Sequence, residues 1–193
     1  MRTAMKAVIA SLLVLMGWAG TAHAQHQHGS GYAAMATRPI KALSEDQITQ
    51  LREGRGMGLS LPAELNSYPG PMHALELANA LRLTPDQRTR LNAIKQQMSS
   101  RAIALGHQVI AAEAQLDRAF ASGQADPSAV VQQLSDIGHL NGELRSVHIL
   151  AHMETRALLT PDQVARYDAE RGYRPAGHQA PQRHNSGEHR RQH

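Results

Sequence analysis

Apolar side chains recur at steps of three and four residues over two long stretches of the chain, Leu91 to Phe120 and Val130 to Leu158. These steps place the side chains on one face of an α-helix. Ser122-Gly123 ends the first stretch, and Asp126-Pro127 begins the second. The pattern therefore predicts two long helices packed side by side as an antiparallel hairpin. Its predicted seam consists of Leu91, Ile94, Met98, Arg101 or Ala102, Leu105, Val109, Ala112, Leu116 and Phe120, facing Val130, Leu134, Ile137, Asn141, Leu144, His148, Ala151, Thr155 and Leu158.

One five-residue pattern occurs three times, as Leu43-Ser-Glu-Asp-Gln47, Leu83-Thr-Pro-Asp-Gln87 and Leu159-Thr-Pro-Asp-Gln163. Ser or Thr suits the N-cap of a helix, Pro suits the first helical position, and Asp is favourable in the positive first turn. The Gln side chain can reach back to the backbone of the cap and close a capping box. The pattern predicts three helix starts, with Thr84 and Thr160 acting as caps and not as ligands.

Shorter helices are predicted over 44–53, 71–81 and 161–171, with loops at 54–58 and 68–71 between the first two. Aromatic residues make up only 3% of the chain, too few for the core of an ordinary sandwich or barrel. We therefore expect an all-α fold, a long antiparallel helical hairpin with short flanking helices.

The two ends of the chain differ from its centre. Residues 1–24 have the features of a cleaved secretory signal: Arg2 and Lys6, an apolar run from Ala7 to Gly20, and the cleavage site Ala22-His23-Ala24. That run is too short for a stable membrane span, so we expect export to the periplasm and no stable membrane insertion. We expect 25–37, which contains histidines, and the His/Arg-rich tail 174–193 to be disordered, leaving 38–173 as the folded domain.

Several function classes lack support in the sequence. The chain has no cysteine, so it offers no disulfide, thiolate metal site or cysteine nucleophile. His148-Ile-Leu-Ala-His152 has the histidine spacing of a zinc protease helix but lacks the glutamate that serves as its base. Basic and acidic residues nearly balance over 38–173, which argues against nucleic-acid binding. We expect a protein that is not an enzyme.

The motifs Leu83-Thr-Pro-Asp-Gln87 and Leu159-Thr-Pro-Asp-Gln163, which bracket a helical hairpin behind a leader, resemble the LTxxQ motifs of the CpxP/Spy family of periplasmic proteins. ZraP and CnrX-type metal sensors share this architecture. The resemblance covers roughly 43–173. It implies a cradle-shaped homodimer that acts in envelope stress as an ATP-independent chaperone for unfolded proteins, as a modulator of a periplasmic sensor domain, or as a metal sensor.

Two sets of residues correspond to two possible functions. His148 and His152 lie one helical turn apart and could bind Zn, Cu or Ni, although His148 could equally be a seam histidine and His152 a solvated one. No cofactor is required by the sequence. A chaperone would instead need adaptable apolar contacts, and this interpretation is preferred here. The candidate client contacts are Met57, Leu59, Leu61, Met72 and Met98; the alternative is that Met98 belongs to the core and that 57–61 wraps on the hairpin.

Leu140, Val147 and Leu150 lie beside the seam of the second long helix and widen its apolar stripe. A stripe wider than one partner helix can cover needs a second surface. We therefore expect a homodimer, with Leu140 or Val147 near the contact.

Overall fold

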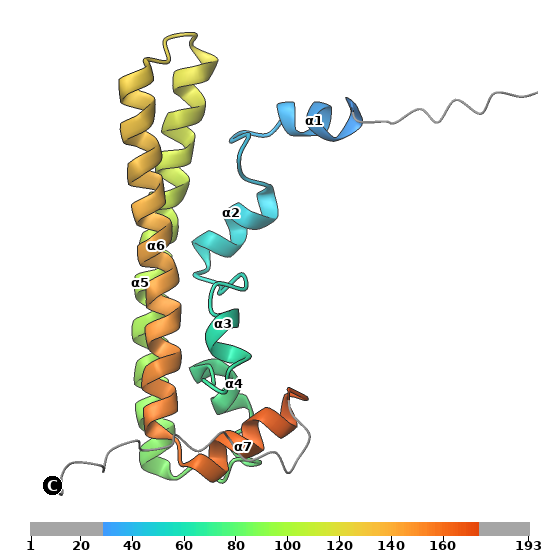
Figure 1. The fold of residues 1–193 in the computed structure, drawn as a ribbon, viewed down its shortest axis with the longest axis vertical. Coiled ribbons are helices and arrows are strands. Elements are labelled where there is room, and N and C mark those ends of the chain that lie inside the picture. Colours follow the sequence, from blue (N-terminus) through green and yellow to red (C-terminus); the bar gives the residue numbers. More distant parts are fainter. Residues whose placement is uncertain (1–28, 174–193) are drawn as a thin grey trace, which may run out of the picture.

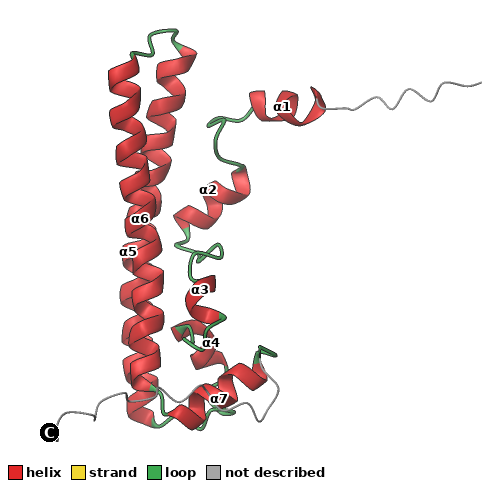
Figure 2. Cartoon of the chain, in the orientation of Figure 1, coloured by secondary structure: helices red, strands yellow, loops and turns green. Residues whose placement is uncertain are grey.

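A computed structural model of the chain describes residues 29–173, which form helices and no strand (Figures 1 and 2). The predicted all-α fold is confirmed. The helices in chain order are α1 (Gly29–Ala36), α2 (Glu45–Arg52), α3 (Leu61–Glu64), α4 (Pro71–Glu76), α5 (Pro85–Ala121), α6 (Pro127–Leu158) and α7 (Pro161–Glu170).

Helices α5 and α6 are the predicted hairpin and pack against each other side by side (Figure 1). With 37 residues, α5 is about 55 Å long. Leu91, Ala102 and Val109 on α5 are buried, as are the predicted seam residues Ile137, Leu144, His148, Ala151 and Thr155 on α6. The seam does not stay buried to the end of the hairpin. Phe120 and Leu134 are more than half exposed there, because the short helices pack closer to the opposite end.

Helices α2, α3 and α4 form a column beside the hairpin (Figure 1). Helix α2 packs on α5 through Leu51, at a point where α5 carries Gly106. A Cβ atom at Gly106 would lie 2.1 Å from the carbonyl oxygen of Leu51. Only glycine allows the end of α2 to approach the backbone of α5 this closely, so Gly106 sets the position of the column.

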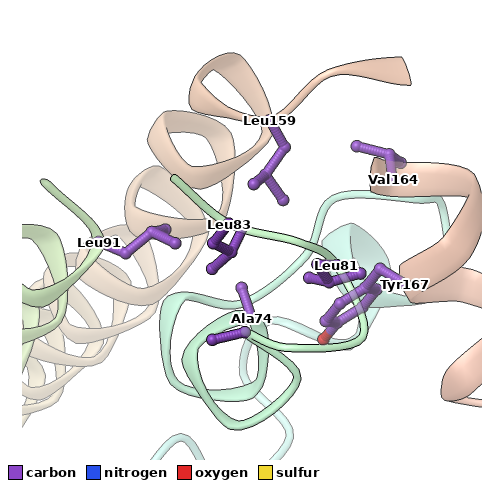
Figure 3. Close-up of a cluster of buried hydrophobic side chains, with 8 residues drawn as sticks. Ala74, Leu81, Leu83, Leu91, Leu159, Val164 and Tyr167 are labelled. Carbon is purple, nitrogen blue, oxygen red and sulfur yellow. The ribbon is translucent and has the colours of Figure 1, made fainter. Parts of the chain in front are cut away.

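The end of the hairpin where α5 begins and α6 ends is closed by α4 and α7 (Figure 1). Their apolar side chains form a compact core around the fully buried Tyr167 (Figure 3). Leu83 and Leu159, the first residues of two motif copies, are part of this core. The predicted helix over 71–81 is shorter than expected. The helix ends at Glu76, and the chain continues through turns toward the start of α5. Arg82, at the end of these turns, has a positive φ of 52°.

Three other expectations differ from the structure or lie outside it. Residues 29–36 form α1, where we expected disordered chain. The leader 1–24, residues 25–28 and the tail 174–193 lie outside the described residues. Val147 is buried within the chain's own core at 5% exposure and Leu140 packs against that core, whereas Leu150 is exposed; the homodimer itself stays a prediction. Within 29–173, no helix is long and apolar enough to cross a membrane.

Candidate functional site

The second and third motif copies have the predicted capping geometry. The Thr84 hydroxyl accepts a hydrogen bond from the Gln87 backbone N–H at 3.1 Å, and the Gln87 Oε1 accepts one from the Thr84 N–H at 3.0 Å. Thr160 and Gln163 repeat both bonds at the start of α7. The prediction that both threonines are N-caps is confirmed.

The glutamines of these two motifs also bind each other. Gln87 Nε2 donates to Gln163 Oε1 at 2.8 Å, and Gln163 Nε2 donates to Gln87 Oε1 at 3.0 Å. Each amide donates in addition to a backbone carbonyl, that of Leu158 for Gln87 and that of Leu81 for Gln163. The motif pair is therefore a structural clasp that joins the start of α5 to the start of α7. Its hydrogen-bonding groups are used within the fold.

Above this clasp a cleft of about 330 Å³ lies between the column and the hairpin. The glycine-rich loop 54–58 and the loop entering α4 form two of its walls, α5 and α6 form the third, and the segment 171–173 that follows α7 closes it. The chemically relevant lining residues are Met57, Glu64, Met72, His73, Met98, His148, His152, Arg171 and Tyr173.

The structure brings the two predicted residue sets into this one cleft. His148 and His152 line it, and so do Met57, Leu61, Met72 and Met98. Leu59 does not; it packs against the core between α2 and the hairpin. Met98 packs against that core as well, so it has a core side and a cleft side. Residues that the sequence assigned to two competing functions therefore share one site, which no spacing along the chain indicated.

His152 has one ring nitrogen occupied and one available. Its side chain is 8% exposed, and Nδ1 lies 2.7 Å from the Tyr68 carbonyl oxygen and 3.4 Å from Glu64 Oε2. A carbonyl only accepts hydrogen bonds, so Nδ1 carries a proton, and in the neutral imidazole the lone pair is on Nε2. This is the arrangement that metal-binding histidines have before a metal binds: one N–H is held by a carbonyl or carboxylate, and the other nitrogen is free.

Gly70 lies directly beside the free nitrogen. A Cβ atom at this position would be 3.0 Å from Nε2 and from Cε1 of His152. Gly70 has φ −78° and ψ 145°, a conformation that any residue adopts, so the backbone does not require glycine here. The absence of a side chain leaves space next to Nε2.

His148 is one turn before His152 and is more deeply buried, at 3% exposure. Its Nε2 is buried and has no hydrogen-bond partner among the described residues. Burial lowers the pKa of His148, and the neighbouring His152 lowers it further. The imidazole is therefore neutral near pH 7, the protonation state in which it can bind a metal ion.

Glu64 is the carboxylate of the cleft, and its oxygens are already occupied. Oε1 accepts hydrogen bonds from the hydroxyls of Tyr167 at 2.5 Å and Tyr173 at 3.0 Å, and Oε2 accepts one from the Gly70 N–H at 3.2 Å. Arg171 Nε lies 3.7 Å from Oε1 and balances the charge. Burial raises the pKa of Tyr167, followed by the hydrogen bond to Glu64, so Tyr167 remains a donor. Glu64 was missed in the sequence, because a single acid between the predicted loops 54–58 and 68–71 carries no signal of burial.

Of the other histidines of the described chain, only His73 lines the cleft. His107 and His139 are exposed, and His139 pairs with Glu143 on its own helix. His73 lines the cleft, but its Nδ1 lies 2.8 Å from Glu76 Oε2. Within residues 29–173, no group of three or more His, Cys, Asp or Glu side chains is arranged to hold a metal ion. The cleft is thus lined by three imidazoles, a carboxylate already in use and three thioethers; the two imidazoles of α6 are the buried ones.

Comparison with known families gives one match. A family model described as heavy-metal resistance matches residues 62–166, from α3 to α7. The match includes both threonine-containing motifs and both cleft histidines, and it supports the resemblance to CpxP/Spy and ZraP-type proteins at the level of the wider helical family. Comparisons with curated proteins and with solved structures gave no match.

Proposed function

Because the chain belongs to the heavy-metal-resistance family, we propose that it is a non-catalytic protein of the periplasm that binds heavy-metal ions in the cleft between α6 and the column of short helices. His148 and His152 are its central ligands. The observation that carries the proposal is the state of these imidazoles: both are buried, they lie one helical turn apart, and one is already held through Nδ1 with Nε2 free.

The energetics of the apo site support this role. A buried imidazole nitrogen without a hydrogen bond is unfavourable, because it has lost its contact with water and gained nothing in exchange. His148 Nε2 is in this position. Binding a metal ion to such nitrogens recovers the lost interaction. Imidazole is a ligand for Zn, Cu and Ni alike, so the histidines alone are compatible with each of these metals.

Titration calorimetry on chelator-stripped protein tests the proposal. We expect a tight site of about one ion per chain, and we expect the double variant His148→Gln/His152→Gln to lose it. The matched control is His107→Gln/His139→Gln, which removes two exposed histidines from the same hairpin and should leave this site intact. If the cleft variant keeps the affinity and stoichiometry of the unaltered protein, the cleft is not the metal site.

A second candidate function is the binding of unfolded proteins, and a different part of the molecule favours it. The free end of the hairpin exposes Phe120, Val131 and Leu134. Phe120 and Leu116 also line an apolar groove of about 480 Å³ with Lys41 and Asp117 at its edge. Adjacent exposed apolar side chains rimmed by charge can hold an unfolded chain with weak contacts.

Suppression of aggregation of a chemically denatured client distinguishes this function from metal binding. Phe120→Ser/Leu134→Ser should reduce suppression without loss of stability, because both side chains are exposed. His148→Gln/His152→Gln should leave suppression unchanged. Full suppression by the hairpin-end variant would remove the chaperone candidate and leave the metal proposal unaffected.

A further inference from the structure

We propose that the cleft selects a soft monovalent ion, Cu(I) or Ag(I), which His148 and His152 bind together with thioether sulfurs of Met57, Met72 and Met98. This inference rests on the proposed metal-binding function and narrows the class of ion. It follows from the donors that the fold brings to the cleft.

The donors themselves favour a soft ion. Imidazoles suit many transition metals, but thioether sulfur is a soft ligand and favours Cu(I) over harder divalent ions. Met57 comes from the glycine-rich loop, Met72 from the first turn of α4, and Met98 from α5. Three separate segments therefore each contribute a methionine to the cleft that contains the two histidines. Methionine side chains are flexible, so sulfurs at the rim can move to an ion held by the imidazoles.

The charge of the lining residues favours a monovalent ion. Glu64 already accepts three hydrogen bonds and is paired with Arg171, so it has little negative charge to offer an ion. The donors that remain, imidazoles and three thioethers, bring no negative charge. A divalent ion bound to neutral ligands in a partly buried cleft would keep two uncompensated charges, whereas a monovalent ion keeps one. The free-energy cost of burying an ion rises steeply with the magnitude of its charge, which favours the monovalent ion.

Two residues of the cleft wall, Gly70 and Met57, depart from what the local backbone favours. The backbone at position 70 has a conformation that any residue adopts, yet the residue there is glycine. The missing side chain leaves one side of His152 Nε2 uncovered. Met57 has a φ of 44°, which is uncommon for a residue with a side chain, and it stands between Gly56 and Gly58. The loop therefore has a methionine at a position where glycine would be less strained. Both departures from local preference occur on the wall of the same cleft.

The decisive variant removes sulfur and keeps volume. In Met57→Leu/Met72→Leu/Met98→Leu the side chains stay apolar and of similar size, so the fold is retained. The matched control is Met35→Leu/Met153→Leu, which alters two exposed methionines outside the cleft lining. Chelator-stripped protein is titrated with Ag(I), with Cu(I) under anaerobic reducing conditions against a chromogenic chelator, and with Zn(II) and Ni(II).

We expect the cleft Met→Leu variant to lose affinity for Ag(I) and Cu(I) by roughly tenfold or more, with affinity for Zn(II) and Ni(II) unchanged and the control variant unaffected. X-ray absorption of the Cu(I) complex should show both sulfur and nitrogen scatterers. Gly70→Ala should weaken binding as well, because its methyl group occupies the space beside His152 Nε2. The equivalent change Gly142→Ala, with nothing within 4 Å of the added Cβ, should not.

The outcomes separate this inference from the function on which it rests. Suppose that Zn(II) or Ni(II) binding is lost in His148→Gln/His152→Gln, while the cleft Met→Leu variant binds Ag(I) and Cu(I) as tightly as the unaltered protein. The preference for a soft ion is then wrong and the metal-binding function stands. If no ion responds to His148→Gln/His152→Gln, both are wrong. An absorption spectrum with nitrogen and oxygen scatterers alone also overturns the inference.

Discussion

The reciprocal hydrogen bonds between Gln87 and Gln163 predict that these glutamines contribute more to stability than an ordinary helix cap does. Replacing Gln87 with Ala removes four hydrogen bonds of its amide: one from the Thr84 N–H, one to the Leu158 carbonyl, and the two shared with Gln163. The side chain is buried, so water does not fully replace these partners.

The size of the effect follows from the number of bonds. A hydrogen bond in a folded protein contributes about 0.5–1.5 kcal/mol net, and a buried group left without a partner costs more. Four bonds, two of them shared with one partner, give an expected loss of about 2–4 kcal/mol in the free energy of unfolding. The double variant Gln87→Ala/Gln163→Ala should lose less than the sum of the single variants, because the two shared bonds are then counted only once.

The first motif copy supplies the control. Gln47 caps α2 through the Ser44 N–H at 2.8 Å, as Gln87 caps α5, but it is exposed. Gln47→Ala should therefore cost only about 0.5–1 kcal/mol. Urea denaturation followed by far-UV circular dichroism, on chelator-treated protein, measures the unaltered protein and the four variants. If Gln87→Ala costs no more than Gln47→Ala, or if the single variants are additive, the paired glutamines contribute nothing beyond their caps.

Three other predictions use the same denaturation measurement. Thr84→Ala and Thr160→Ala should each cost roughly 1 kcal/mol through loss of an N-cap, without changing metal affinity; full retention of stability would contradict the capping role. Gly106→Ala should lower the free energy of unfolding by at least about 2 kcal/mol, because the added Cβ would clash with the Leu51 carbonyl. An unchanged urea midpoint would show that α2 can shift away from α5 without cost. Burial lowers the pKa of His148 in the folded chain, so below pH 6.5 the unfolded chain binds a proton that the folded chain does not. The free energy of unfolding of the metal-free protein should therefore fall as the pH drops below 6.5. His148→Gln should make this fall smaller. Identical pH profiles for the variant and the unaltered protein would contradict the assignment to His148.

The sequence determined the features that depend on neighbours within one or two helical turns. The three capping boxes, the ends of the hairpin helices and the buried seam at Leu91, Leu144 and Ala151 all follow from local spacing, and the structure confirms them. The sequence also singled out His148 and His152 from their helical spacing. It did not show that α4 ends at Glu76 or that the seam opens near Phe120, because both depend on which other segment packs there.

Only the tertiary structure decided what the chosen residues do. Three motif copies look alike in the sequence, yet only Gln87 and Gln163 meet, because α5 and α7 both begin at the closed end of the hairpin. Met57, Met72 and Met98 lie far apart in the chain from His152 and reach one cleft because the column of short helices packs along α5 and α6. Periodicity reports which face of a helix is apolar, but it carries no information about which distant segment covers that face. Which segment covers the face depends on close packing between backbones, as at Gly106, and on buried polar partners such as Glu64. The residues next to Glu64 in the sequence do not indicate that it is buried.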